Sequence, residues 1–210
     1  MTAANDLLFD GPETGSLLVL AHGAGAPMDS PFMQTMAEGL AARGLRVVRF
    51  EFPYMAERRA SGRKRAPNPA RVLEAHYAEV VRSLGDPGAI VIGGKSMGGR
   101  IASQIAADLG VCGVVCLGYP FHPPGRPTQL RTAHLEDLGT PTLILQGERD
   151  TFGGRHEVAG YGLAPAIEVT WVPDGDHSFK PRVRSGHTEA GNLELAIEAI
   201  GAWLDRSFGR

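Results

Sequence analysis

The 210-residue sequence lacks the compositional biases that mark special classes of protein. Its formal net charge is only −2, so no overall charge draws it toward nucleic acid or an anionic membrane surface. Hydrophobic residues at 43% and charged residues at 21% are ordinary proportions for a soluble globular protein. We therefore expect a globular chain with no nucleic-acid partner.

Long apolar segments are also missing. The opening MTAANDLLFD has neither a basic cluster nor an extended apolar core, so we expect no signal peptide. No stretch approaches the roughly 18 unbroken apolar residues that a membrane helix needs, so we expect no membrane partner. Residues 1–210 have the length of one domain. We predict a single-domain cytoplasmic protein whose oligomeric state stays open.

Cysteine is scarce, and both cysteines, Cys112 and Cys116, lie in one apolar run, VCGVVCLG. If this run is a β-strand, four residues at about 3.3 Å each separate the two by roughly 13 Å. A disulfide bond needs Cα atoms within about 7 Å. We therefore expect buried thiols without a disulfide, in a reducing compartment.

The sequence is rich in glycine (28 residues) and proline (15 residues), which indicates many tight turns between short elements. Short apolar runs predict strands, and longer segments with helical spacing predict the helices between them. Because the apolar runs do not alternate with polar residues, we expect strands covered on both faces, as in a mostly parallel sheet. This pattern predicts a doubly wound α/β fold of about six strands with helices on both faces. The predicted strands lie within residues 16–23, 45–53, 89–94, 111–120, 141–150 and 166–173, and the predicted helices within 31–44, 69–85, 97–110 and 190–207.

The segment VIGGKSMGG, residues 91–99, fits two motifs with different chemistry. Gly94-Lys95-Ser96 matches the end of a phosphate-binding loop, which requires another glycine five residues before Gly94. That position is Ala89, and the residues in between have the character of a strand, whose backbone N–H groups are used in the sheet. This mismatch excludes the nucleotide-binding interpretation.

The same segment also contains Gly-x-Ser-x-Gly, from Gly94 to Gly98, between a predicted strand and a predicted helix. This is the setting of a nucleophile elbow, a strained turn with positive φ that exposes a serine side chain. Gly94 and Gly98 leave room where the strand and the helix come closest. We predict that Ser96 is a catalytic nucleophile, and a helix N-cap is the alternative.

A serine nucleophile needs a base and an orienting acid, which follow it in this architecture in the order acid, then histidine. Asp150 ends the strand-like LILQGERD and should lie at the carboxyl edge of the sheet, where ligands of such folds gather. Glu148 ranks second as the acid. His177 follows the last predicted strand, in VPDGDHSFK, with His187 as the second candidate. The predicted catalytic residues are therefore Ser96, Asp150 and His177.

An oxyanion hole should be formed by two backbone N–H groups. One belongs to Met97, the residue after the nucleophile. The other should come from the glycine-rich loop AHGAGAP, residues 21–27, where we favour Ala24 and rank Gly23 next. We expect His22 to hold this loop by hydrogen bonds rather than take part in the reaction.

HGAG, GGKSMGGR, LQGERD and GDHSF occur in this order over nearly the whole chain, and the set resembles the α/β-hydrolase family, close to its dienelactone-hydrolase-like branch. AHGAGAPMDSPFM, FPYM and GYPFHPPGRP resemble more narrowly a small group that includes proteins related to a subunit of a chromatin acetyltransferase complex. The resemblance implies a minimal α/β-hydrolase fold and the Ser96–Asp150–His177 triad. It also implies that the fold can serve as a non-catalytic scaffold, as some such relatives do. Dienelactone hydrolase has a cysteine nucleophile where this chain has Ser96, so its lactone substrate is not carried over.

Residues 118–140, where lipases of this fold carry a long lid, form a short and proline-rich segment. We therefore expect an open cleft without a large lid, suited to small or extended soluble substrates. The segment GYPFHPPGRP places Tyr119, Phe121 and His122 where they would wall a substrate pocket near Ser96. Core packing or a rigid turn explains the same residues equally well.

Residues 57–65, ERRASGRKR, are strongly basic and are expected to form a loop on the rim of the site. Arg58 and Arg59 are predicted to clamp a carboxylate or phosphate of an anionic substrate, because arginine forms paired hydrogen bonds with both groups. The alternative is a solvated, mobile loop. The histidine spacing does not resemble a metal site, and we expect no metal and no cofactor.

The sequence thus predicts a serine hydrolase that cleaves a small-molecule acyl substrate: an ester, thioester or activated amide. The reaction would pass through an acyl-enzyme on Ser96. The alternative is a protein-interaction module on an α/β-hydrolase scaffold. Every residue type that the triad requires is present, which favours catalysis.

Overall fold

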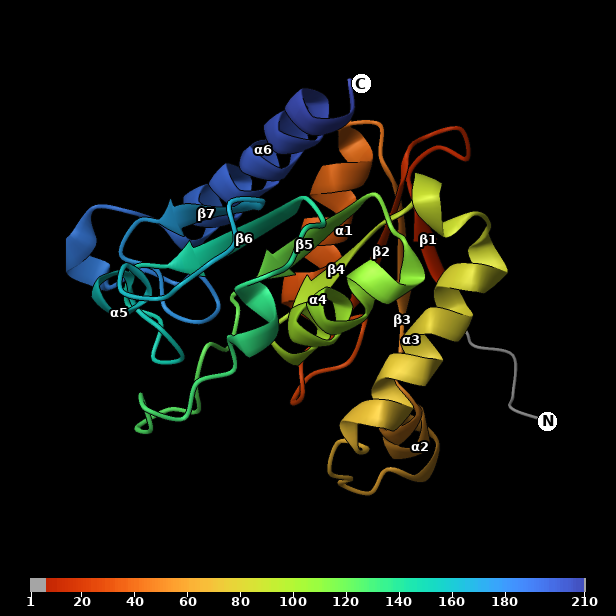
Figure 1. The fold of residues 1–210 in the computed structure, drawn as a ribbon, viewed down its shortest axis with the longest axis horizontal. Helices are drawn as coiled ribbons and strands as arrows, with labels where there is room; N and C mark the ends of the chain where they lie inside the picture. Colours follow the sequence, from red (N-terminus) through yellow and green to blue (C-terminus); the bar gives the residue numbers. More distant parts are fainter. Residues whose placement is uncertain (1–6, 210) are drawn as a thin grey trace.

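A computed structural model describes residues 7–209, which fold around one seven-stranded β-sheet (Figure 1). The strand order is β1-β3-β2-β4-β5-β6-β7, and neighbouring strands are parallel except for β1, which runs antiparallel to β3. This arrangement confirms the predicted α/β class with a mostly parallel sheet. The strands are β1 (Leu8–Asp10), β2 (Leu17–Ala21), β3 (Arg46–Phe50), β4 (Val91–Lys95), β5 (Gly113–Leu117), β6 (Thr142–Gly147) and β7 (Ile167–Val172).

Helices cover both faces of the sheet. One core cluster joins β-strand side chains to α1 and α6, and a second joins them to α3 and α4 on the opposite face (Figure 1). Strand residues such as Val19 and Leu20 therefore alternate between two apolar layers, which explains why the strands read as continuous apolar runs. The helices are α1 (Pro31–Ala42), α2 (Pro53–Ser61), α3 (Ala70–Leu84), α4 (Met97–Leu109), α5 (Arg155–Val158) and α6 (Glu189–Phe208), with short 3₁₀ turns at Pro87–Ala89, Ala133–Leu135 and Val183–Ser185.

Strand β1 was not predicted from the sequence. It has only three residues, too few to show a strand pattern, and Phe9 in its centre is half exposed. Its pairing with β3 is stabilised by a side-chain contact, in which the buried guanidinium of Arg49 donates to Asp10 Oδ2 at 2.9 Å. An edge strand of this kind depends on its neighbour rather than on its own sequence pattern.

The prediction of a loop over residues 57–65 was wrong for its first half, because α2 extends to Ser61. Pro53 occupies the start of this helix, where its fixed φ is favourable and its missing N–H costs nothing. Gly62 ends the helix in the left-handed conformation, with φ of 66°. Arg58 and Arg59 therefore lie in the last helical turn, where positive charge interacts favourably with the helix dipole.

The turn between β4 and α4 confirms the geometry expected of an elbow. Ser96 has φ of 52°, a positive value that residues with a side chain seldom adopt. A Cβ atom on Gly94 would lie 2.3 Å from the carbonyl oxygen of Ala21, and one on Gly98 would lie 2.4 Å from the same atom. Both glycines are therefore needed for β2, β4 and α4 to come this close.

Cys112 and Cys116 do not form a disulfide bond, as the strand geometry predicted. Burial raises the pKa of the Cys116 thiol above its ordinary range, so this side chain stays protonated in the core. Across residues 7–209, none of the helices has both the length and the apolar character that crossing a bilayer demands.

We expect Gly98→Ala to lower the free energy of unfolding by about 1–3 kcal/mol, the usual cost of overpacking a close contact. An alanine in the helix would contribute about 1 kcal/mol of helix propensity, but the clash is with backbone and cannot be relieved by a rotamer change. Chemical denaturation measures the difference. Gly139→Ala is the matched control, because its added Cβ meets nothing within 4 Å, and equal stability of the two variants would contradict this account.

Candidate active site

Three side chains that are far apart in the sequence meet at the carboxyl edge of the sheet. Ser96 follows β4, Asp150 lies three residues beyond β6, and His177 lies in the loop after β7. Ser96 Oγ is 2.8 Å from His177 Nε2, and His177 Nδ1 is 2.7 Å from Asp150 Oδ2. The structure thus brings together the three residues that sequence order had singled out.

The imidazole of His177 is arranged to accept a proton from the serine. The Asp150 carboxylate can only accept, so the ring proton lies on Nδ1 and Nε2 is left to accept from the Ser96 hydroxyl. Burial lowers the pKa of His177, while the hydrogen bond to Asp150 opposes this effect. The Phe152 ring stacks on the imidazole, with centroids 4.2 Å apart. The histidine is therefore held neutral in one orientation.

Asp150 is fully buried and is held by two further donors. The backbone N–H of Phe152 donates to Oδ1 at 2.8 Å, and the side-chain amide of Gln146 donates to Oδ2 at 3.0 Å. Gln146 also accepts a hydrogen bond from the N–H of Tyr119 at 2.7 Å, so it ties the end of β6 to the loop after β5. Sequence reasoning missed Gln146, because no motif connects it with Asp150.

Lys95 is a second residue that sequence reasoning missed. Its ammonium group is buried, donates to the backbone carbonyl of His177 at 2.7 Å and lies over the Phe32 ring. Burial lowers the pKa of Lys95 to about 8. Its positive charge also contributes to the lowered pKa of His177. Lys95 therefore positions the histidine loop and biases the imidazole toward its neutral form.

Hydrogen bonds to its backbone carbonyl groups hold the glycine-rich loop after β2 in place. His22 is buried, its Nδ1 donates to the carbonyl of Gly23 at 2.7 Å, and its Nε2 accepts from the N–H of Phe52 at 3.1 Å. These contacts confirm that His22 holds the loop. The Tyr54 hydroxyl donates to the carbonyl of Ala24 at 3.0 Å and is 3.4 Å from that of Gly23.

Two backbone N–H groups are left available beside Ser96. Within residues 7–209, the N–H groups of Ala24 and Met97 have no hydrogen-bond partner. Met97 is the first residue of α4, where a helical N–H has no acceptor in the preceding turn. In a trans peptide the N–H and C=O point in opposite directions, so the contacts at Gly23 O leave the N–H of Ala24 on the other side.

The second-ranked candidates for the acid and the base do not contact Ser96, His177 or Asp150 through their side chains. Glu148 accepts from Arg155 at 2.6 Å and from the N–H of Asp174 at 3.0 Å, so its carboxylate links loops rather than contacting His177. His187 is exposed, and its backbone N–H bonds to Ser185. Neither side chain joins the cluster at Ser96.

Two pockets meet at Ser96, and Ala24 and Phe152 also line both of them. The first, of about 370 Å³, includes His177, Lys95 and Phe32, and we name it the histidine pocket. The second, of about 350 Å³, includes Met97, Arg100, Pro120 and Arg131, and we name it the arginine pocket. A larger depression of about 680 Å³ lies near the starts of β2 and β3, at the opposite edge of the sheet, and contains none of these groups.

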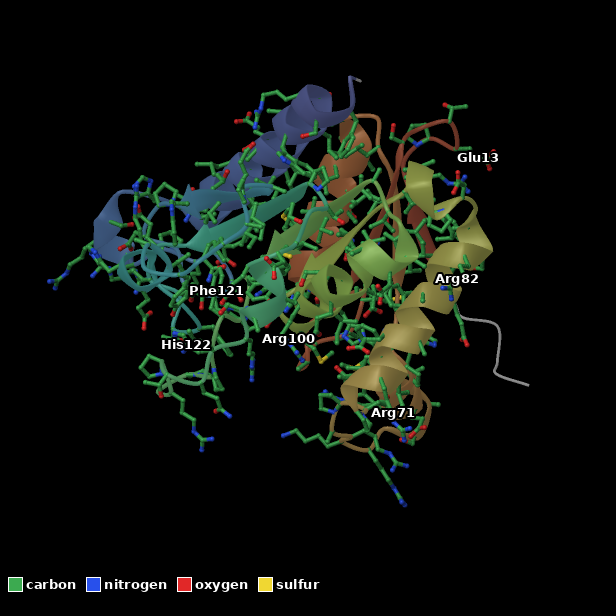
Figure 2. All side chains as sticks on the ribbon, in the orientation of Figure 1. Glu13, Arg71, Arg82, Arg100, Phe121 and His122 are labelled. Carbon is green, nitrogen blue, oxygen red and sulfur yellow. The ribbon has the colours of Figure 1, made fainter. Side chains whose placement is uncertain are left out.

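Tyr119, Phe121 and His122 do not line either pocket, contrary to the expectation that they wall the substrate site. All three are buried, and the rings of Tyr119 and Phe121 pack together at 4.8 Å (Figure 2 labels Phe121 and His122). The Tyr119 hydroxyl donates to the carbonyl of Arg131 at 3.0 Å, which fixes the following loop. Only Pro120 of this segment reaches the pocket, because the chain turns its aromatic rings inward.

Arg58 and Arg59 also lie outside both pockets. Arg59 pairs with Glu51 at 2.6 Å and with Asp29 at 2.8 Å, so two carboxylates already balance its charge. Arg58 donates to the carbonyl of Gly25 at 3.3 Å. The structure therefore places this arginine pair as a support of the glycine-rich loop rather than against Ser96. Among residues 7–209, no group of three or more potential metal ligands gathers at a point.

The alpha/beta hydrolase domain family matches this chain over residues 14–205. Because that match spans most of the sequence, the protein belongs to the α/β-hydrolase family.

Solved structures of the same fold cover nearly the whole chain. A serine hydrolase without a lid from Xanthomonas campestris has 20% identity and a TM-score of 0.68, over 96% of this chain and 88% of that one. Dienelactone hydrolase from Anabaena variabilis has 21% identity and a TM-score of 0.70, over 96% and 92%. Est1E from Butyrivibrio proteoclasticus, solved with ferulic acid, has 16% identity and a TM-score of 0.70, over 98% and 96%. At these identities the likeness shows the fold alone.

Replacing Lys95 by methionine is expected to raise the pKa of His177. The change removes a positive charge that disfavours the imidazolium form. Since the neutral imidazole is the form that accepts the serine proton, the acid limb of a pH–rate profile would move to higher pH. NMR titration of the His177 ring protons measures this pKa directly.

Lys180→Met is the control for this experiment. Lys180 lies in the same loop as His177 and carries the same charge as Lys95, but its side chain is exposed and pairs with Glu189 at 3.8 Å. It should leave the pKa of His177 unchanged. An unchanged value in Lys95→Met as well would show that the lysine charge does not act on the imidazole.

Proposed function

We propose that the protein is a serine hydrolase in which Ser96, His177 and Asp150 form a catalytic triad. The observation that carries this proposal is the continuous chain of hydrogen bonds from Ser96 Oγ through the imidazole to the buried carboxylate. Ser96 would attack the carbonyl carbon of the substrate while His177 Nε2 takes the hydroxyl proton. Asp150 would keep the proton of the imidazole on Nδ1 and stabilise the imidazolium that forms.

The N–H groups of Met97 and Ala24 would stabilise the negative charge that develops on the carbonyl oxygen, with Gly23 as the second candidate in the loop. Both are free of other partners within the described chain and lie beside Ser96 in the arginine pocket. Each such donor contributes about 2.7–4 kcal/mol to the rate in well-studied hydrolases. These donors are backbone groups held by the elbow and by His22, so they need no rearrangement during the reaction.

The reaction would proceed through an acyl-enzyme. When the tetrahedral intermediate collapses, the bond to the leaving group breaks and His177 returns the proton to the departing oxygen, sulfur or nitrogen. Water then attacks the acyl carbon, giving its proton to the same nitrogen. The released acid and the regenerated Ser96 hydroxyl complete the cycle.

The substrate that this site suits best is a small or extended soluble ester, thioester or activated amide. Ser96 and His177 are partly exposed between two modest pockets, which supports direct access from solvent. Est1E, which has the same fold, has been solved with ferulic acid, a small carboxylic acid, bound to it. No metal or cofactor is needed for this chemistry.

A non-catalytic role as a protein-interaction module remains the second candidate. It is motivated by AHGAGAPMDSPFM, FPYM and GYPFHPPGRP, which resemble proteins related to a chromatin acetyltransferase complex subunit. A scaffold does not require a buried aspartate, an oriented imidazole and two unoccupied N–H groups around one serine. The assembled site therefore favours catalysis.

Labelling with a fluorophosphonate probe tests the proposed function. We expect the wild-type protein to be labelled at Ser96, because the probe reacts with a serine whose proton a neighbouring base removes. Ser96→Ala and His177→Ala should both abolish labelling and lower the hydrolysis of a short-chain ester by about 10⁴-fold or more. Mass spectrometry of the labelled protein identifies the modified residue.

His187→Ala is the matched histidine control and should label as the wild type does, because this side chain is exposed and takes no part in the hydrogen bonds of Ser96 and Asp150. Folded wild-type protein that takes up no label would contradict the hydrolase proposal. That outcome would turn attention to the interaction module, and pull-down of partners would be the next measurement.

A further inference from the structure

The arginine pocket holds two cationic side chains beside Ser96. Arg100 lies on α4 one helical turn after Ser96, with its N–H bonded to the Ser96 carbonyl at 3.0 Å, and Arg131 comes from the loop after β5. Figure 2 labels Arg100, which lies near the start of α4. No acidic residue of the described chain lines this pocket.

Neither arginine has a carboxylate partner within residues 7–209. The guanidinium of Arg100 donates to the neutral side chain of Gln104 at 3.2 Å, and the Arg131 side chain forms no hydrogen bond or ion pair there. Arg49 and Arg59, by contrast, are each paired with carboxylates. Two converging positive charges without a counter-charge repel each other, and a bound anion would remove that repulsion.

The surroundings agree with an electropositive site. Burial and the charge of Arg100 both lower the pKa of Arg131. The pKa of His134, whose Nε2 lies 2.9 Å from Ser103 Oγ, is also lowered by burial and by Arg100, so this histidine stays neutral. The Tyr119 hydroxyl faces the same region, and burial raises its pKa above the ordinary range, which keeps it neutral.

The position of His177 decides which part of a substrate lies in this pocket. The imidazole must protonate the leaving group, so the leaving group has to lie on the side of Ser96 where His177 is. His177 lines the histidine pocket and does not line the arginine pocket. The acyl part of the substrate therefore points toward Arg100 and Arg131.

We propose that the protein acts on monoesters or thioesters of dicarboxylic acids, and that Arg100 and Arg131 bind the free carboxylate at the far end of the acyl group. This assignment rests on the proposed serine-hydrolase function. Guanidinium groups hold a carboxylate through paired hydrogen bonds, which selects for a planar anion as well as for its charge. The proposed anion-binding pair is therefore Arg100 and Arg131, which lie beside Ser96, in place of Arg58 and Arg59.

Three fluorogenic esters separate the possibilities: the umbelliferyl monoglutarate, the umbelliferyl pentanoate, and the pentanoate of a carboxylated umbelliferone. The first carries the anion on the acyl side, the second carries none, and the third carries it on the leaving group. We expect the wild type to prefer the monoglutarate. Arg100→Gln and Arg131→Gln should each lower the ratio of kcat/KM for monoglutarate over pentanoate by about 10- to 100-fold, mainly through KM.

Arg126→Gln is the matched control. Arg126 is exposed in the same loop and its substitution changes the net charge equally, but it lines neither pocket, so the ratio should not change. A further measurement needs no variant: free glutarate should inhibit pentanoate hydrolysis by the wild type more strongly than free pentanoate does.

Wild type that hydrolyses the pentanoate without preferring the monoglutarate, or a preference that survives both substitutions, would overturn this inference and leave the hydrolase proposal intact. If Arg100→Gln and Arg131→Gln instead lowered kcat/KM for the ester with the carboxylated leaving group, the assignment of the anion to the acyl side would be overturned. Failure of all three esters together with absence of fluorophosphonate labelling would remove the proposed function and this inference with it.

Discussion

The contact between the elbow and the carbonyl oxygen of Ala21 constrains the rest of the site. Gly94 and Gly98 approach this one oxygen so closely that a Cβ on either would overlap it. The contact holds the end of β4 and the start of α4 against β2, and Ser96 lies between these two glycines with a positive φ. The same contact places the first N–H of α4 next to the loop that begins at His22. Ser96 and the N–H groups of Met97 and Ala24 therefore share one backbone framework.

Hydrogen bonds to buried groups orient the remaining parts of the site. The Asp150 side chain has no exposed surface, and its charge is stabilised by the N–H of Phe152, the amide of Gln146 and the ring of His177. A buried carboxylate without such donors would carry a large desolvation penalty. Lys95 acts on the other side of His177, where it bonds to the backbone carbonyl and opposes protonation of the ring. The imidazole is thus held between a negative and a positive group.

The arginines of this protein differ in what balances their charge. Arg49 and Arg59 are matched to carboxylates of the chain and serve the fold, Arg49 at the edge strand β1 and Arg59 between Glu51 and Asp29. Arg100 and Arg131 have no such partner in the part of the chain that the structure describes. Whether an arginine is paired with a carboxylate of the chain therefore indicates anion binding better than a cluster of arginines in the sequence does.

The sequence by itself determined the elements whose signals are local. Apolar runs and helical spacing marked six of the seven strands and the helices α1, α3, α4 and α6. Gly-x-Ser-x-Gly, followed by an aspartate and a histidine after later strands, was enough to select Ser96, Asp150 and His177, because parallel strands end at one edge of a sheet. Strand β1 and helix α2 were not predicted, since one depends on pairing with β3 and the other has only two buried residues, Tyr54 and Met55, to mark a helical pattern.

Only the tertiary structure decided which side chains meet across long sequence separations. Gln146 beside Asp150 and Lys95 against the carbonyl of His177 are contacts that no spacing encodes, and the same holds for the shared pocket of Arg100 and Arg131. The inward turn of Tyr119 and Phe121, and the pairing of Arg59 with Glu51, likewise follow from which surfaces are buried together. Hydrophobic periodicity specifies which face of an element is buried, whereas the partner that a polar side chain finds depends on how all the elements pack.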